Sequence, residues 1–176
     1  MSKAEEVYSA LIGPIERKMM RTVTRILQDP DDAADAFQEA LAYIWKNLKQ
    51  IHRHANPQAY ILRICASAAL DLLRKRMRIE KRERPIDDSP LHGTEVLVST
   101  KIHERETVRA IQGRIADLPK QQAEAVLLRA FEEQSFESIG RALGCSEATA
   151  RSHVSKGLAR LRTLLSAPEW GKEINQ

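Results

Sequence analysis

Side chains that could bind nucleic acid gather in the last third of the sequence, between Arg141 and Arg162. This stretch holds five basic residues and one acidic residue. Its hydroxyl, imidazole and cationic groups are those of Ser146, Thr149, Arg151, Ser152, His153, Lys156 and Arg160. Guanidinium and hydroxyl groups on the leading turns of a helix suit the base edges and phosphates of a DNA major groove. The pattern predicts a DNA-reading surface; the alternative is a solvated helix with a positive face.

Two short helices joined by a turn are expected to position this surface. Ser135 predicts the N-cap of the first helix, and Gly144 can take the positive φ that ends it. Gly140 is a small residue that lets the two helices approach, and Ser146 can cap the second helix. The expected buried seam consists of Ile139, Leu143, Cys145, Ala150, Val154, Leu158 and Leu161. Caps and small residues at these offsets predict a helix-turn-helix, a geometry that also occurs in proteins that never touch DNA.

A second candidate surface lies on an amphipathic helix in the first half of the chain. Asp29 and Pro30 begin this helix, where acidic groups favour the positive end of the helix dipole. Its apolar stripe, expected to be buried, consists of Ala33, Ala36, Phe37, Ala40, Leu41, Ile44 and Trp45. Asp35, Gln38 and Glu39 fall on the opposite face. They form an acidic, amide-bearing surface that packing does not explain, unless it is simply a solvated helix face.

A polar, basic loop from Lys49 to Pro57 separates that helix from a longer one over about 58–78. The longer helix is apolar on most sides, so we expect it to pack between neighbours and to expose one edge. That edge is the polar strip, defined by Arg63, Ser67, Asp71 and Arg74. The helix continues into the segment 74–84, which holds seven basic and two acidic residues. Such a run either follows nucleic-acid phosphates or keeps a helix end solvated.

Proline, glycine and acidic residues interrupt the helical pattern after residue 84. We expect an extended acidic linker over 85–105. It would join a helical domain at 1–84 to a second at 106–168, with a polar tail at 169–176. Apolar spacing is helical almost throughout, so the predicted fold class is all-α, with two small helical domains on either side of a flexible linker.

Length and composition limit the function. The chain has 176 residues, a net charge of +4 and 43% hydrophobic residues. That is enough apolar material for a core, and it argues against a wholly disordered protein or a large multidomain enzyme. The sequence has no phosphate-binding glycine loop and no Ser, His and Asp set with a local signature. His52 and His54 lack further ligands nearby, so we expect no enzyme activity, metal or cofactor.

Cys65 and Cys145 lie in apolar helical contexts without a nearby partner for a metal site. They are expected to be reduced, buried thiols. The first residues lack the apolar stretch of a signal peptide, and no uncharged window approaches the roughly 20 residues that span a bilayer. These features predict a cytoplasmic protein with no membrane partner.

Three segments together resemble the bacterial sigma factors of the extracytoplasmic-function (ECF) group, in the sigma-70 family of RNA polymerase subunits. The first, 32–45, is similar to the family's D-A-E-D segment with its following Q-E and W. The second, 59–76, looks like the family's W-L segment with its following N and D-x-x-R. The third is the helix-turn-helix introduced by Leu118 and Pro119. The sequence departs from the usual residues at Ala34, Tyr60, Ser67, Gly140 and Ala150.

The resemblance implies a non-enzymatic protein that binds core RNA polymerase, directs it to promoters and helps to open the duplex. Residues 1–84 would be sigma domain 2 and 106–168 sigma domain 4. Asp35, Gln38 and Glu39 would dock on the clamp helices of the polymerase beta-prime subunit. Promoter DNA is the second implied partner, and an anti-sigma factor is a third to be tested.

The resemblance also assigns DNA contacts. The minus-10 set is His52, Arg53, His54, Asn56, Arg63, Ser67, Arg74 and Arg76. The minus-35 set is Ser146, Thr149, Arg151, Ser152, His153, Lys156 and Arg160. Trp45 and Tyr60 are expected in the core rather than as stacking platforms. The acidic linker resembles the segment that family members thread toward the RNA exit path of the polymerase.

Two other functions remain open from the sequence. A helix-turn-helix regulator that binds an operator without polymerase would explain residues 118–162, but it leaves the acidic surface at Asp35 without a role. A helical adaptor that binds only protein would explain the first half and leave the basic helix without one.

Overall fold

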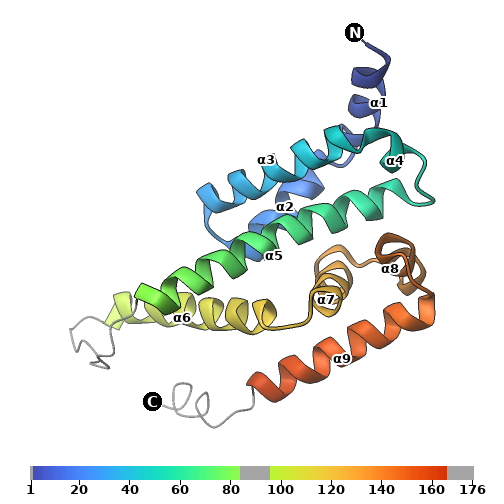
Figure 1. The fold of residues 1–176 in the computed structure, drawn as a ribbon. Helices are drawn as coiled ribbons and strands as arrows, with labels where there is room; N and C mark the ends of the chain where they lie inside the picture. Colours follow the sequence, from blue (N-terminus) through green and yellow to red (C-terminus); the bar gives the residue numbers. More distant parts are fainter. Residues whose placement is uncertain (1, 84–95, 166–176) are drawn as a thin grey trace.

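The computed structural model describes residues 2–83 and 96–165, and every regular element in these ranges is an α-helix, as predicted (Figure 1). The first unit consists of α1 (Lys3–Ile12), α2 (Glu16–Leu27), α3 (Pro30–Lys46), α4 (Leu48–His52) and α5 (Pro57–Glu83). The second unit consists of α6 (Val96–Ala116), α7 (Lys120–Glu132), α8 (Phe136–Leu143) and α9 (Glu147–Leu165). In the described part of the chain, no helix is both long and apolar enough to cross a membrane.

Helix boundaries differ from the prediction in two places. The short helix α4 lies within the loop expected at 49–57. Helix α6 begins at Val96, inside the expected linker, and the rest of that linker at 85–95 lies outside the described residues. The early start of α6 has a local reason, because no glycine or proline occurs between Gly93 and Gly113. A helix propagates until such a residue stops it.

The acidic start of α3 is capped as predicted. The side chain of Asp29 accepts hydrogen bonds from the backbone N–H groups of Asp31 and Asp32, both at 3.0 Å. The bond from Asp32 lowers the pKa of the Asp29 carboxyl, so the cap is charged at neutral pH. Pro30 occupies the first helical position, where its missing N–H costs nothing. These local contacts set where α3 begins.

The core of the first unit forms between α2, α3 and α5. Met19, Ile44, Ile61 and Leu70 are fully buried there. The prediction that Trp45 is buried with the rest of its stripe is wrong, because Trp45 is 48% exposed. Its ring meets only the edge of Tyr8 from α1, with ring centroids 5.3 Å apart. Trp45 lies in the last turn of α3, next to the fully buried Ile44.

Both cysteines are free thiols, as expected, but only one is buried. Burial raises the pKa of the Cys65 thiol to about 12, so it stays protonated at any physiological pH. Cys145 is half-buried in the turn between α8 and α9. Cys65 therefore acts as a small apolar core residue.

The helix-turn-helix has the caps that the sequence predicts. Ser135 Oγ accepts a hydrogen bond from the Ser138 N–H at 3.1 Å, at the start of α8. Gly144 ends α8 with φ +70°, in the left-handed region. Ser146 Oγ accepts from the Thr149 N–H at 3.1 Å, at the start of α9. Short-range bonds thus define both helices of the motif.

One residue of the expected seam does not lie in it. Ala150 and Val154 are buried, whereas Leu158 is 46% exposed, so its predicted burial is wrong. Gly157 takes the buried position instead, because a Cβ there would lie 2.6 Å from a methyl group of Val126 on α7. Helix α9 therefore presents the row 150, 154, 157 and 161 to α7, and the missing side chain of Gly157 allows the two helices to approach.

Gly140→Ala should lower the free energy of unfolding by about 1–3 kcal/mol, because it overpacks the motif. A Cβ at this position would lie 2.8 Å from the backbone carbonyl oxygen of Cys145. Gly113→Ala is the matched control, since a Cβ there has no neighbour within 4 Å. It should raise stability by up to about 1 kcal/mol through helix propensity. Urea unfolding followed by circular dichroism tests the pair; equal midpoints would contradict the expectation.

Candidate functional site

The predicted DNA-reading residues of α9 lie on different sides of the helix, with Arg151 and Arg160 half a turn apart around its axis. Ser146, Thr149, Arg151, Lys156 and Arg160 are exposed. Ser152 and His153 are half-buried. The surface of α9 is cationic and projects from a capped helix, as contacts with phosphates and base edges require.

Local contacts hold Arg151 at the start of α9. Its Nη2 lies 2.9 Å from Glu147 Oε1, and its guanidinium carbon lies 4.4 Å from the centre of the Phe136 ring. Arg129 of α7 also stacks on Phe136, at 4.8 Å. Phe136 was not predicted as a functional residue, because its only signal in the sequence is an aromatic side chain at the first position of α8. Exposed ion pairs and cation–π contacts are weak, so DNA can displace them.

The acidic face, defined by Asp35, Gln38 and Glu39, is exposed on α3. The opposite side of the same helix buries Ala36 and Ala40 completely or almost so. The structure therefore places the three polar side chains together, on a side of α3 that packing within the first unit leaves uncovered.

The loop before α5 is ordered by its own polar groups. His54 Nδ1 accepts a hydrogen bond from the Asn56 N–H at 3.0 Å, and its ring stacks on Tyr60 with centroids 4.5 Å apart. Asn56 Nδ2 donates to the hydroxyl of Ser138 on α8 at 2.7 Å. His52 and Arg53 are exposed. Tyr60 is half-buried, so it is a packing residue with one accessible edge.

The polar strip of α5 forms only part of the exposed edge that we expected from the sequence, because Asp71 is exposed whereas Arg63, Ser67 and Arg74 are half-buried. It lies against the second unit, which contacts α5 through α6, α7 and α8 (Figure 1). Arg63 Nε donates to Glu124 Oε2 at 3.0 Å, and its Nη1 donates to the carbonyl of Ala142 at 3.2 Å. The pattern of an apolar helix with one polar edge was correct, but a neighbouring unit covers part of that edge.

The far end of the strip is covered in the same way. Arg74 Nε donates to the carbonyl of Ala116 at 3.0 Å, and its Nη2 donates to the carbonyl of Leu118 at 2.8 Å. Lys120 Nζ lies 3.0 Å from Asp71 Oδ2. Arg74 thus satisfies the carbonyl groups at the end of α6, and Lys120 brings a cation from the start of α7 to the carboxylate of the strip.

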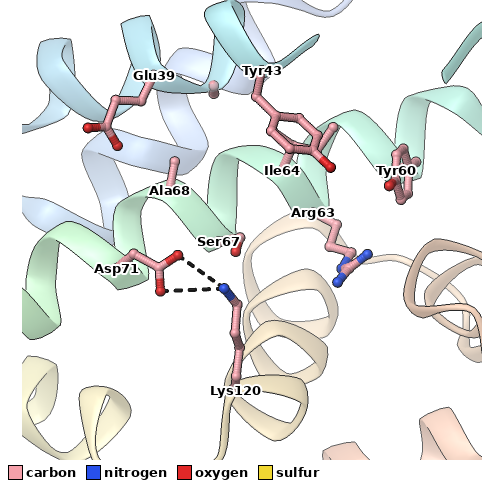
Figure 2. A pocket seen from close by; sticks show the side chains of 10 residues that line it. Glu39, Tyr43, Tyr60, Arg63, Ile64, Ser67, Ala68, Asp71 and Lys120 are labelled. Atoms are coloured by element: carbon pink, nitrogen blue, oxygen red, sulfur yellow. Dashed lines mark hydrogen bonds and ion pairs between the residues drawn. The ribbon is translucent and has the colours of Figure 1, made fainter. Parts of the chain in front are cut away.

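A cavity of about 350 Å³ lies where α3, α5 and the start of α7 meet. Figure 2 shows Glu39 and Tyr43 on α3, Ser67 and Asp71 on α5, and Lys120 reaching toward Asp71. The acidic face and the polar strip therefore border the same hollow.

Arg76 is not part of this arrangement. It pairs with Asp32 at the start of α3 and lies 3.4 Å from Glu80 on its own helix. The structure therefore separates Arg76 from Arg63 and Arg74, although the sequence analysis grouped them.

Two buried carboxylates were missed from the sequence. Glu124 and Glu132 of α7 have fully buried side chains. Glu132 accepts a hydrogen bond from the Thr22 hydroxyl at 2.6 Å and lies 3.5 Å from Lys18 Nζ. Glu124 Oε1 has no hydrogen-bond partner within the described residues, whereas Glu132 Oε2 is the oxygen that faces Lys18 Nζ in the ion pair. An acidic residue inside an apolar run was the only available signal, and it could equally have marked an exposed helix position.

Within residues 2–83 and 96–165, no three His, Cys, Asp or Glu side chains gather as metal ligands would.

Comparison with known proteins matches both units. Residues 11–79 match the family model described as Sigma-70 region 2, and residues 109–161 match Sigma-70, region 4. The RNA polymerase sigma-E factor of Streptomyces coelicolor is 31% identical over 150 residues, which cover 85% of this chain and 80% of that protein. The ECF RNA polymerase sigma factor SigM of Mycobacterium tuberculosis is 27% identical over 160 residues, covering 91% and 78%.

Two solved structures share the fold. CnrH, in complex with the cytosolic domain of CnrY, has a TM-score of 0.55 and 17% identity, over 94% of this chain and 96% of that one. The sigma factor RpoE of Bartonella quintana, in complex with the anti-sigma factor NepR, has a TM-score of 0.51 and 21% identity, over 89% and 95%.

Proposed function

The chain belongs to the extracytoplasmic-function group of the sigma-70 family of RNA polymerase sigma factors. From this membership we propose which residues contact the polymerase and which contact each promoter element. It binds core RNA polymerase and directs promoter-specific initiation of transcription. Members of this family are not enzymes in the catalytic sense. The alternative, a regulator that binds an operator without polymerase, does not explain why residues 11–79 match sigma region 2.

The proposed domain boundaries are those expected from the sequence, although α6 of the second unit already begins at Val96. Residues 1–84 form sigma domain 2 and residues 106–168 form sigma domain 4, joined by 85–105, of which the last ten residues are already helical in α6. The protein acts in the cytoplasm, where its polymerase partner works.

The acidic face is the proposed docking site for the clamp helices of the beta-prime subunit. Its support is the exposure of Asp35, Gln38 and Glu39 on a helix whose other side is buried. Exposed carboxylates and an amide suit a basic, hydrogen-bonding partner, since complementary charge steers association and specifies orientation.

The minus-10 element is proposed to meet the polar strip and the loop before α5. Arg63 and Arg74 would contact phosphates, and Ser67 would lie beside an unstacked base. The loop before α5 would approach the same strand with His52, Arg53, His54 and Asn56. Arg76 would contact this DNA only after its ion pair with Asp32 is broken.

The minus-35 element is proposed to bind the surface of α9. The exposed Arg151 in the leading turns is placed to read bases, whereas Arg160, two and a half turns further on, is placed to contact phosphate. The remaining contacts would come from Ser146, Thr149, Ser152, His153 and Lys156.

An anti-sigma factor is a further proposed partner. The support is indirect, from the complex of RpoE with NepR, a structure with a similar fold. Co-purification of the chain with the product of a neighbouring gene, followed by loss of transcription when that product is added, would test it.

The observation that carries the proposed function is the combination, in one chain, of an exposed acidic helix face and a capped basic helix-turn-helix. Run-off transcription with purified core polymerase on a promoter library tests it. We expect specific transcripts that depend on the chain. Duplex binding by the chain without any specific transcript would instead favour an operator-binding regulator.

A further inference from the structure

We propose that Glu147 determines part of the promoter specificity of this protein, because its carboxylate is placed to accept a hydrogen bond from the N4 amino group of a cytosine in the major groove. The minus-35 set expected from the sequence contains only basic and hydroxyl-bearing residues. Glu147 is the only acidic residue between Arg141 and Arg162. The proposal deepens the proposed function and rests on it, since α9 must bind the minus-35 element.

The place of Glu147 in the fold is that of a base-reading residue. It is the first residue of α9, and its side chain is exposed. In a helix-turn-helix, the N-terminal residues of the second helix contact the base edges. Thr149 and Arg151 are exposed in the same leading turns. The next residue, Ala148, is exposed and short, so it does not keep the start of the helix away from DNA.

The capping of α9 does not explain this carboxylate. Ser146 Oγ already accepts a hydrogen bond from the Thr149 N–H at 3.1 Å and lies 2.8 Å from the Thr149 hydroxyl. The Glu147 side chain extends along the helix instead, where Oε1 lies 2.9 Å from Arg151 Nη2. A carboxylate at a helix N-terminus is mildly favourable. That contribution is the same for every DNA sequence, so it predicts no effect on base preference.

A carboxylate on a DNA-binding surface restricts which bases it can face. The phosphates repel it, and so do the acceptor atoms O6 and N7 of guanine, N7 of adenine and O4 of thymine. Cytosine presents an N4 amino donor without such an acceptor, so it is the base that a carboxylate accepts from. Glu147 therefore both selects cytosine and rejects the other bases, and rejection is an effective source of specificity.

Arg151 and Glu147 are held side by side, which links the bases that they read. The Arg151 guanidinium carbon lies 4.4 Å from the centre of the Phe136 ring, and its other neighbour is Glu147. The side chains of this ion pair are 61% and 53% exposed, so the pair is weak and both groups can turn toward DNA. An arginine prefers the O6 and N7 atoms of guanine. The two residues together predict a guanine and a cytosine close to one another.

Helix geometry limits the distance between these two bases. Residues four apart are about one helical turn, or about 5.4 Å, apart along the axis. Successive base pairs are about 3.4 Å apart. The cytosine should therefore lie within about two base pairs of the guanine that Arg151 contacts.

The decisive experiment is selection of minus-35 sequences from a randomised promoter library by core polymerase that carries the full-length chain. The wild type should select cytosine near the guanine that Arg151→Ala no longer selects. Glu147→Gln should select adenine in place of this cytosine, because a glutamine amide both donates and accepts and so fits adenine N6 and N7. We expect the ratio of cytosine to adenine to fall on the order of 10-fold or more.

Glu147→Ala separates direct reading from an indirect effect through Arg151. This variant should lose the preference at the cytosine position and keep the preference for guanine. A residue that only orients Arg151 would give the opposite result, a change confined to the guanine position in both Glu147 variants. That result, or an unchanged preference at every position, would overturn the proposal.

Glu137 of α8 provides the matched control. It is exposed in the first turn of its helix and pairs with an arginine four residues further on, Arg141. Glu137→Gln removes the same charge as Glu147→Gln but should leave the selected sequence unchanged. Equal changes in the two variants would mean that net charge, rather than the position of Glu147, governs the selection. Loss of stability cannot imitate the expected result, since it lowers binding to all sequences and does not exchange one preferred base for another.

The same selection separates this inference from the proposed function. If the wild-type chain selects no promoter sequence with core polymerase, the proposed function fails. If the wild type selects a specific minus-35 sequence and Glu147→Gln selects the same one, only the role of Glu147 fails.

Discussion

Reversing two charges of the acidic face, in D35K/E39K, should weaken binding to core polymerase by at least about 30-fold and abolish promoter-directed transcription. Both side chains are exposed, and the buried stripe of α3 is untouched, so helical content should not change. The effect is large because the substitutions replace attraction with repulsion at the centre of the proposed interface. Titration of labelled core polymerase gives the affinity directly.

Glu6 and Glu16 provide the matched control for this experiment. Both are exposed carboxylates, in α1 and α2, so E6K/E16K changes the net charge by the same amount. This variant should bind polymerase almost as the wild type does. Equal losses in the two double variants would mean that net charge, rather than the acidic face, governs the affinity.

Arg151→Ala should change which minus-35 sequence the polymerase complex prefers, at a cost of about 1–3 kcal/mol on promoters with guanine at the contacted position. The side chain is exposed in the leading turns of α9, and its contacts with Glu147 and Phe136 in the free chain are weak. Arg151→Lys should recover only part of the discrimination, since an ammonium cannot make the two parallel bonds of a guanidinium.

Arg160→Ala is the control for Arg151→Ala, because it removes a proposed phosphate contact instead of a base contact. Arg160 lies further along α9, where its Nη1 donates to Gln122 Oε1 at 3.1 Å. Its loss should weaken binding to every promoter similarly, because a phosphate contact carries no sequence information. Selection of minus-35 variants from a randomised library, with both mutant complexes, measures the two effects together. Uniform losses for Arg151→Ala as well would refute this division of roles.

Short-range signals predicted the starts of α3, α8 and α9 and the end of α8 correctly. Asp29 caps α3, Ser135 caps α8, Gly144 ends α8 and Ser146 caps α9, all as expected. The three caps depended on a side chain and a backbone N–H within three residues of it, and the end of α8 depended on the positive φ of Gly144. Such contacts are present whatever the rest of the chain does, so sequence spacing is enough to infer them.

Burial at the margin of a helical stripe was harder to predict. Trp45 and Leu158 both belong to an apolar pattern, yet both are about half exposed. Periodicity indicates which side of a helix is apolar, but the neighbouring helix decides how much of that side is covered. In α9 the deciding residue is Gly157, where a close approach to Val126 moves the contact to one side of Leu158.

The sequence alone was sufficient for the all-α class, the helix-turn-helix, the acidic face of α3 and the polar strip of α5, because periodicity and capping encode them locally. Only the folded chain shows that Arg63 and Arg74 of this strip are bound by Glu124 and by carbonyl groups of the second unit. Those partners lie 42 to 79 positions away along the chain. A polar edge that faces solvent and one that faces another domain have the same pattern, and the packing of the two units distinguishes them.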